Sequence, residues 1–321
     1  MIDSPLLLLK LVGLWLLLTT VASLIAAAAY PLYRRQLTSV SPPRRSWLRL
    51  VYGLMPVVAS SLVVLLMAHP ALAGLLVPEH CHGAACGAHT PVLGSGTMAS
   101  IGFAAFGALG GFVVLGLLAW FLRRAAARLR TLERLTRLTS RAGNHRVLES
   151  EGLIACCIGL LQPQVLVSRG LLNALDETEL RAVLAHERAH AERRDNLRGF
   201  LLHTATQGWP RARRRQLRED LSSDAEQACD AQAVAVVGGP QPVIDAIMRL
   251  NELGHRGALR RGVAFGEGDA AVRLERLTGC ALPSQGGFQA VASLGLFWLL
   301  LATVLTALSH GFLERLTAFG L

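Results

Sequence analysis

One short stretch of the chain has the residue types and spacing of a metal site. His186-Glu187-Arg188-Ala189-His190 follows the pattern H-E-x-x-H. Four residues advance an α-helix by about 400°, so the two imidazoles project from one face, one turn apart. Two nitrogen ligands on one helix suit tetrahedral Zn²⁺, which in a catalytic site needs a third protein ligand and an open position for water. Glu187 is placed to take a proton from that water as a general base.

A later pair of acids can complete this site. Glu226 and Asp230 are four residues apart in a stretch predicted to be helical from about 216 to 237, before Gly238-Gly239-Pro240 ends it. They therefore share a face. Glu226 can supply the third, oxygen ligand, and Asp230 is placed to hold an imidazole N–H, as carboxylates do behind zinc ligands. The alternative is two solvated acids, although the rest of this stretch is mostly small and apolar. The pattern predicts one zinc ion per chain.

The elements around H-E-x-x-H can also be predicted. Asp176-Glu177-Thr178-Glu179 has the pattern of a helix N-cap with a glutamate three residues on. Before it, two short apolar runs at 152–161 and 164–167, separated by Gln162-Pro163, are typical of a β-ribbon. An exposed edge of such a ribbon can hold an extended peptide by strand addition.

The composition indicates a membrane protein. Hydrophobic residues make up 52% of the 321-residue chain and charged residues 17%, against about 25% charged in a typical soluble domain. The mean hydropathy is +0.42. The apolar excess gathers in four runs, each long enough to approach the roughly 20 residues of a membrane-spanning helix. These runs lie at about 6–29, 50–69, 98–122 and 288–308.

The basic residues predict the orientation. The first loop, 30–49, contains five arginines, whereas the second loop, 70–97, contains no Lys or Arg. By the positive-inside rule the N-terminus is outside, the first loop is cytoplasmic and the second loop is outside. Residues 123–287 are then cytoplasmic, within a bacterial-type inner membrane protein.

We therefore expect a mainly α fold, a polytopic helical membrane protein with four spans and a cytoplasmic α+β domain inserted between spans 3 and 4. Three spans occupy 1–122, the zinc domain 123–287, and the fourth span with a short outer tail 288–321. The arginine-rich stretch 125–138 is predicted as a helix lying along the membrane surface. Membrane lipid is thus one partner. The net charge of +10 does not predict nucleic-acid binding, because no recognition motif accompanies it.

The outer loop contains a second group of chemically capable residues, and two interpretations of it remain open. One is a small disulfide between Cys81 and Cys86, in an oxidising compartment. The other is a soft-metal site made by the two thiolates with a nearby imidazole. The imidazoles available are His80, His82 and His89.

The residue that stabilises the oxyanion is not identified by the sequence. Arg273 and Arg276 follow the zinc helices and were the available cations, but in an arginine-rich chain both are predicted to be surface charges. Cys229 is predicted to pack as a small apolar residue.

Several motifs of the inner domain resemble the BlaR/MecR-type membrane zinc metallopeptidases, over about 153–237. The resemblance implies a gluzincin-like fold with zinc on His186, His190 and Glu226, and Glu187 as general base. It also implies a role for Asp195, expected at a helix end or behind a zinc ligand. The antibiotic receptors of that family continue into an extracellular penicillin-binding domain, whereas this chain stops at Leu321, so β-lactam sensing is not expected. The matching motifs are Gly159-Leu160-Leu161-Gln162-Pro163-Gln164-Val165-Leu166-Val167, Glu179-Leu180-x-Ala182-Val183-Leu184-Ala185-His186-Glu187-Arg188-Ala189-His190, Arg193-Arg194-Asp195-Asn196 and Ala228-Cys229-Asp230.

The expected function is a zinc-dependent membrane endopeptidase that cleaves a cytoplasmic protein, such as a DNA-binding repressor, in response to a signal. One alternative is a quality-control protease of the HtpX type, which shares H-E-x-x-H and a later Glu-x-x-x-Asp. The other is a non-catalytic signalling module with a metal- or redox-sensing outer loop. Asp195 and the Leu-Leu-x-Pro-x-Val-Leu stretch favour the first, and an intact Glu187 argues against the last, because scaffolding needs no base.

Overall fold

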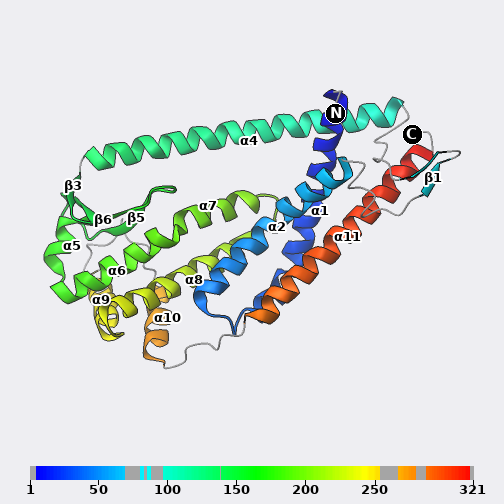
Figure 1. The fold of residues 1–321 in the computed structure, drawn as a ribbon. Helices are drawn as coiled ribbons and strands as arrows, with labels where there is room; N and C mark the ends of the chain where they lie inside the picture. Colours follow the sequence, from blue (N-terminus) through cyan, green and yellow to red (C-terminus); the bar gives the residue numbers. More distant parts are fainter. Residues whose placement is uncertain are drawn as a thin grey trace.

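The computed structural model describes residues 5–68, 80–82, 85–87, 97–137, 139–253, 267–279 and 287–318. Over these residues the protein is mainly helical, with a four-stranded mixed sheet and a separate two-stranded hairpin. The helices form an elongated molecule, with the small sheet at one end and the chain termini at the other (Figure 1). The prediction of a mainly helical protein with an α+β portion is confirmed at this level.

Three helices are long and apolar enough to cross a membrane. They belong to α1 (Pro5–Gln36), α2 (Pro42–Ala68) and α11 (Phe288–Ala318). These helices lie side by side, and both α1 and α11 contact α2 (Figure 1). Aromatic side chains fill the space between them, with the rings of Tyr33 and Tyr52 stacked 4.7 Å apart. The spans are Leu8–Gln36, Pro42–Met67 and Phe288–Thr306.

The helix α4 (Thr97–Arg137) holds the run predicted as a further span at 98–122. Its apolar portion, Ala104–Trp120, is shorter than the other three spans, so a fourth span stays a prediction. The helix crosses α1 at very close range, because a Cβ atom added to Gly107 would lie 1.7 Å from the carbonyl oxygen of Leu9. Small residues permit such backbone contact between membrane helices.

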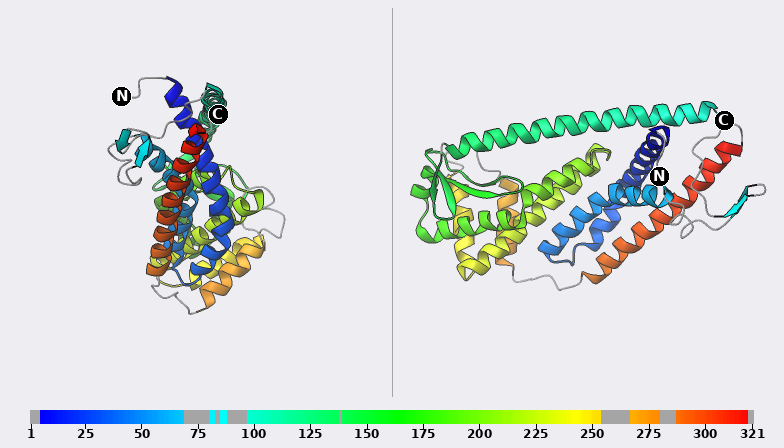
Figure 2. Two further views of the ribbon diagram at one scale, coloured as in Figure 1. Left: turned by 90° about the vertical axis from the view of Figure 1, so that its right-hand side faces the viewer. Right: turned by 45° about the horizontal axis from the view of Figure 1, so that its top comes forward.

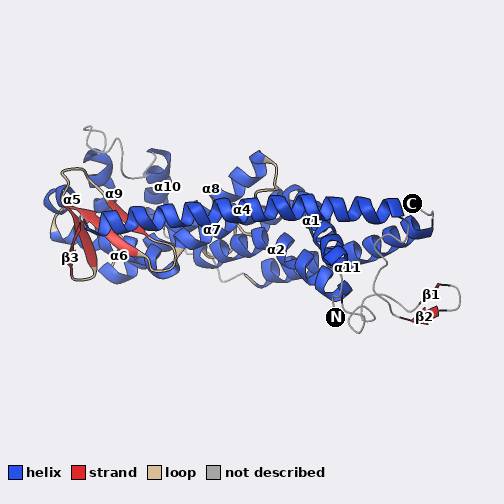
Figure 3. Ribbon diagram, turned by 90° about the horizontal axis from the view of Figure 1, so that it is seen from above, coloured by secondary structure: helices blue, strands red, loops and turns tan. Residues whose placement is uncertain are grey.

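The helix predicted at 125–138 is present over the described residues, but it is the end of a longer helix. α4 continues without a break from its apolar portion through the arginines to Arg137, and it reaches the small sheet (Figure 3). The physical reason is local. Arg123-Arg124-Ala125-Ala126-Ala127 contains good helix formers and no glycine, proline or capping residue, so nothing stops the helix at the end of the apolar run. The helix therefore also runs through the predicted domain boundary at 122.

The sheet lies beside the helix that carries H-E-x-x-H. Its strand order is β3-β4-β6-β5, with β4 and β6 parallel and the other two pairs antiparallel. The β5–β6 pair is the predicted ribbon, which is confirmed, and β5 forms one edge of the sheet. The hairpin of β3 and β4 was not predicted. The strands are β3 (Thr139–Ala142), β4 (His145–Leu148), β5 (Ala155–Ile158) and β6 (Gln164–Ser168).

Six helices lie between the sheet and α11 in the described part of the chain. The predicted capping box starts α6, because the Asp176 carboxylate accepts the Glu179 N–H at 2.8 Å and the Glu179 carboxylate accepts the Asp176 N–H at 3.0 Å. The predicted end at Gly238 is also confirmed, with this glycine in the left-handed conformation at φ 84°. The helices are α5 (Arg169–Ala174), α6 (Glu177–Arg193), α7 (Asp195–Ala205), α8 (Arg211–Val237), α9 (Gln241–Leu253) and α10 (Glu267–Thr278).

Two apolar cores hold the structure together. One joins the sheet to α5, α6, α9 and the end of α8. The other lies among the membrane helices and includes the tip of the α7–α8 hairpin, where Trp209, Leu202 and Leu217 are buried against Tyr30 and Tyr52. The hairpin thus packs directly on α1 and α2 (Figure 2). The core fixes the position of α8 relative to the membrane helices.

The outer-loop hairpin consists of β1 (His80–His82) and β2 (Ala85–Gly87). Its antiparallel register sets Cys81 opposite Cys86. His89 lies outside the described residues. The backbone pairing is compatible with a disulfide and with a shared metal ion, so both interpretations stay open.

Candidate metal centre

The two histidines of H-E-x-x-H meet the later glutamate at one point. His186 and His190 project from α6 with their Nε2 atoms 3.2 Å apart. Glu226, on α8, reaches both, with carboxylate oxygens 3.4 Å from each Nε2. Because α6 and α8 pack against each other, the three side chains are held in place by two rigid helices. The structure therefore brings together the three residues predicted to bind zinc.

The outer nitrogens of both imidazoles are held by carboxylates. His186 Nδ1 is 3.0 Å from Asp230 Oδ1, and His190 Nδ1 is 2.9 Å from Asp195 Oδ2. Asp230 lies behind an imidazole, where the helical spacing placed it. Asp195 begins α7 directly after the turn at Arg194, and this turn aims it back at His190. Each Nδ1–H donates outward, so each Nε2 presents a lone pair inward.

This donor set fits zinc. The two Nε2 lone pairs and the Glu226 oxygens converge with no hydrogen between them, so a cation is needed to satisfy them. Tetrahedral ligands about 2.0–2.1 Å from a zinc ion lie about 3.3 Å from one another. The separations of 3.2 Å and 3.4 Å agree with that geometry.

Glu187 lies beside the donor set and is suited to accept a proton. Its side chain is buried, with the residue 6% exposed. Burial raises its pKa, which makes the carboxylate a stronger base than an exposed glutamate. With His186 and Arg273 it lines a cavity of about 20 Å³, enough space for one water molecule.

Arg273 corrects the sequence analysis, which predicted a surface charge. The residue is 4% exposed, and its guanidinium binds both oxygens of Asp230, at 2.6 and 2.8 Å. It also lies 3.4 Å from a Glu226 oxygen. The prediction failed because the position depends on α10 folding back onto α8. Arg276, on the same helix, is exposed as predicted. Arg273 neutralises the buried Asp230 and so fixes the carboxylate that orients His186.

Replacing Arg273 by glutamine is expected to weaken zinc affinity by about 10–100-fold, because Asp230 would be left buried without its cation. Competition with a chromophoric chelator measures this affinity. Arg276→Gln, on the exposed face of α10, is the matched control and should bind zinc like the wild type. Equal affinities in both variants would contradict the role given to Arg273.

A second group of possible ligands overlaps the first. His190, Asp195 and Cys229 also lie within reach of a single ion. Cys229, however, is buried, and burial raises the pKa of its thiol to about 11. A protonated thiol is an acceptable donor to Asp195, whose Oδ2 lies 3.6 Å from the sulfur. We therefore assign this group to the support of His190.

Asn196 was singled out only as part of a motif, and the structure gives it a contact. Its side-chain amide donates to the carbonyl oxygens of Cys157 at 2.8 Å and Gly159 at 3.2 Å. These carbonyls belong to the edge strand β5 and the residues just after it. The amide thereby joins that edge to α7 next to Asp195, which fixes the sheet relative to the donor set.

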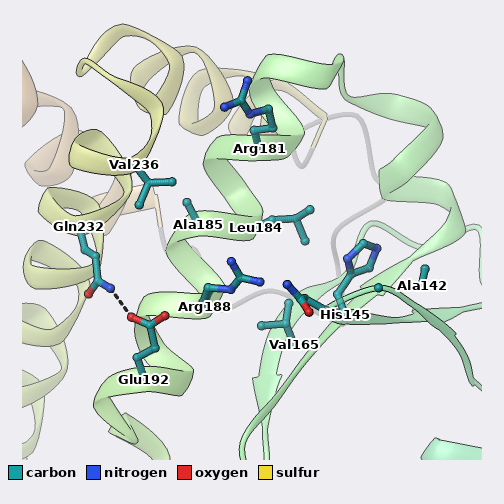
Figure 4. A pocket seen from close by; sticks show the side chains of 12 residues that line it. Ala142, His145, Val165, Arg181, Leu184, Ala185, Arg188, Glu192, Gln232 and Val236 are labelled. Atoms are coloured by element: carbon teal, nitrogen blue, oxygen red, sulfur yellow. Dashed lines mark hydrogen bonds between the residues drawn. The ribbon is translucent and has the colours of Figure 1, made fainter.

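Two cavities border α6 on different faces. A groove of about 740 Å³ between α7 and α8 includes His190, Asp195 and Glu226 in its lining. The other, of about 640 Å³, lies between α6, α8 and the sheet (Figure 4). Arg181, Arg188 and His145 are among the residues that line it, and the Gln232 side chain donates a hydrogen bond to Glu192 at its edge. This second cavity contains no member of the donor set, whereas the groove is lined by His190 and Glu226, so we take the groove as the approach of substrate to the metal centre.

Comparison with known proteins supports a metallopeptidase. The model of peptidase family M48 matches residues 122–236, which include His186, Glu187, His190 and Glu226. This region is thus similar to the domain of peptidase family M48. The match does not specify whether this region is of the BlaR/MecR type. No curated protein and no solved structure matches the chain.

Proposed function

We propose that this protein is an integral membrane zinc-dependent endopeptidase of the BlaR/MecR type, which cleaves a cytoplasmic protein in response to a signal. The observation that carries the proposal is the convergence of His186, His190 and Glu226 beside a buried Glu187. Three candidate membrane spans and the M48 match support the coarser assignment to membrane metallopeptidases.

Each residue of the metal centre has a distinct part in the proposed reaction. Zinc, when held by His186, His190 and Glu226, supplies a Lewis acid that polarises the scissile carbonyl and makes water more acidic. Glu187 accepts a proton from the attacking water and delivers it to the leaving amine as the C–N bond breaks. Asp230 and Asp195 keep the Nδ1–H tautomer of each imidazole, so that both Nε2 atoms stay available as ligands.

The edge strand β5 is the proposed support for the substrate backbone. It is the outer strand of the sheet and packs against α6. An extended peptide can add to such an edge through main-chain hydrogen bonds. Asn196 already binds the outward carbonyl of Cys157, so pairing is expected at Ala155, the first residue of the strand.

Ion pairs between the membrane helices and α8 support regulation from the membrane. Arg49, on α2, binds Asp220 at 2.5 Å and Asp224 at 2.6 Å. Arg45 binds Asp224 at 2.5 Å and Gln227 at 2.7 Å. Asp224 and Gln227 flank Glu226 on the same helix. A movement of α2 would therefore be transmitted to the segment that carries a zinc ligand.

Replacing Arg49 by glutamine is expected to lower the free energy of unfolding by about 3 kcal/mol, because Asp224 is buried and loses one of its two cations. Chemical unfolding of the full chain in detergent micelles measures this. Arg44→Gln, an exposed position on α2, is the control and should change stability little. Similar small effects of both variants would show that the network does not hold α8 to the membrane helices.

The proposal also requires the zinc domain to lie in the cytoplasm. The contacts of Arg45 and Arg49 with α8 set the first loop and the zinc domain at the same end of the membrane helices, which agrees with the orientation predicted from charge. We expect a membrane-impermeant thiol reagent, after reduction and permeabilisation of any outer envelope, to label Cys81 and Cys86 and to spare Cys156 and Cys157. The reverse labelling would place the protease outside and end the cytoplasmic-substrate proposal.

The substrate is best sought by proteomics of cleavage products in cells with the wild-type chain or Glu187→Gln. A repressor-type DNA-binding protein cut only by the wild type would support regulation. Many unfolded membrane proteins among the products would favour the quality-control alternative. Absence of any difference would contradict the endopeptidase assignment and favour a non-catalytic signalling module.

A further inference from the structure

The groove between α7 and α8 is basic beyond the metal centre. One end of the groove is formed by His190 and Glu226, and its lining continues along α7 and α8 toward the tip of their hairpin. The two helices run antiparallel to each other (Figure 1). On α8 the lining residues recur every three or four positions and so form one stripe on the helix face that carries Glu226. Apart from His190, Asp195 and Glu226, the charged lining consists of Glu219 and five arginines: Arg198, Arg211, Arg214, Arg215 and Arg218.

Some of these arginines already have partners, and others do not. Arg215 is paired with Glu219 at 2.6 Å, and Arg214 donates to the side chain of Gln207 at 3.1 Å. Arg211 and Arg218 are exposed, and neither has a side-chain partner among the described residues. The groove therefore keeps an uncompensated positive charge that faces solvent within reach of a peptide bound at the metal centre.

The chemistry of guanidinium groups identifies the ligand class. Arginine binds carboxylates through two parallel N–H donors, and a cleft lined by one sign of charge concentrates oppositely charged ligands. The hairpin also packs on α1 and α2, so anionic lipid headgroups are a competing occupant. The direct continuity of the groove with His190 and Glu226 favours a substrate over a lipid.

We propose that the α7–α8 groove selects substrates with acidic side chains on one side of the scissile bond, through Arg211 and Arg218. This inference rests on the proposed function and names its substrate class. An acidic segment entering the groove would be drawn along the stripe of arginines and hold the adjoining peptide bond at the His190 and Glu226 end of the groove. The acidic residues of the substrate thus set which bond is cut.

The test is cleavage-site profiling with the full chain in detergent micelles and zinc. The probe is the peptide mixture obtained by digesting cytosolic protein with trypsin, and products are identified by mass spectrometry. We expect Asp and Glu to be enriched on one side of the cut bonds. In a synthetic peptide built on that profile, changing the enriched Glu to Gln should lower kcat/KM about tenfold, as expected for one charge-assisted hydrogen-bonded pair.

Two variants complete the design. Arg211→Gln combined with Arg218→Gln should abolish the acidic enrichment and cleave the Glu and Gln peptides alike. Arg213→Gln is the matched control, because Arg213 lies on the same helix but outside the groove lining and donates to Gln216. It should keep the wild-type preference.

Several results would overturn the inference. Cleavage by the wild type without acidic enrichment would refute it while leaving the proposed function intact, as would enrichment that survives in the double variant. A double variant that keeps its cleavage preference but loses binding to phosphatidylglycerol vesicles would assign the arginines to lipid instead. Failure of the zinc-loaded wild type to cut any peptide would overturn the proposed function and this inference together.

Discussion

Replacing Glu187 by glutamine is expected to lower peptide hydrolysis about 10³-fold, within the range attributed to general acid–base catalysis, while zinc remains bound. Glutamine keeps the shape of the side chain but cannot accept the proton of the attacking water. Glu187 is not one of the converging donors, so its loss leaves the three ligands in place. Zinc content and cleavage rate, measured on the same purified sample, separate the two effects.

The control for this variant is Glu192→Gln. Glu192 lies on the same helix but is exposed, and its side chain accepts a hydrogen bond from Gln232 on α8. It should retain activity. Zinc near one ion per chain together with unchanged hydrolysis in Glu187→Gln would refute the assignment of the general base.

The second large effect is expected from the ligands. His186→Ala or Glu226→Ala should lose stoichiometric zinc and all hydrolysis, because each removes one of three protein donors. The folded chain should also lose the stabilisation that metal gives, so the thermal unfolding temperature should no longer rise when zinc is added. Metal analysis after gel filtration measures the first effect, and unfolding scans with and without zinc measure the second.

Gln232→Ala is the control on α8. Gln232 lies after Glu226 on the same helix, and its side chain donates a hydrogen bond to the exposed Glu192. It should retain zinc and the zinc-dependent rise in unfolding temperature. Full zinc content in Glu226→Ala would mean that another residue completes the site. The structure offers one such group, around Cys229.

The donor set could be predicted from the sequence because it depends on local geometry. The spacing of His186 and His190 fixes their common face on any α-helix, and the spacing of Glu226 and Asp230 does the same on the second helix. The start of α6 was equally local, since its capping box lies within four consecutive residues. The ribbon of β5 and β6 followed from two apolar runs around a proline. The role of Asp195 came only from the family resemblance.

What the sequence could not predict depends on contacts between distant segments. Arg273 is identical in type to many surface arginines of this chain, and only the packing of α10 on α8 buries it. The docking of the α7–α8 hairpin on the membrane helices was also missed. Leu202 and Leu217 satisfy an ordinary amphipathic pattern, which does not reveal whether their partners are soluble or membrane helices. The length of α4 was not predicted either. The change from apolar to basic residues near 122 suggested the end of a helix, but the helix continues to Arg137.

X-ray absorption at the zinc edge of the full chain, with Cys81 and Cys86 replaced by serine so that the outer loop offers no thiolate, tests the central claim most directly. If His186, His190 and Glu226 hold the ion, the spectrum will show only nitrogen and oxygen neighbours, at about 2.0–2.2 Å, with two imidazole signals. The same spectrum is expected for Glu187→Gln, whereas Glu226→Ala should give no bound zinc. A sulfur neighbour at about 2.3 Å would place the ion on the Cys229 group and contradict the proposed centre.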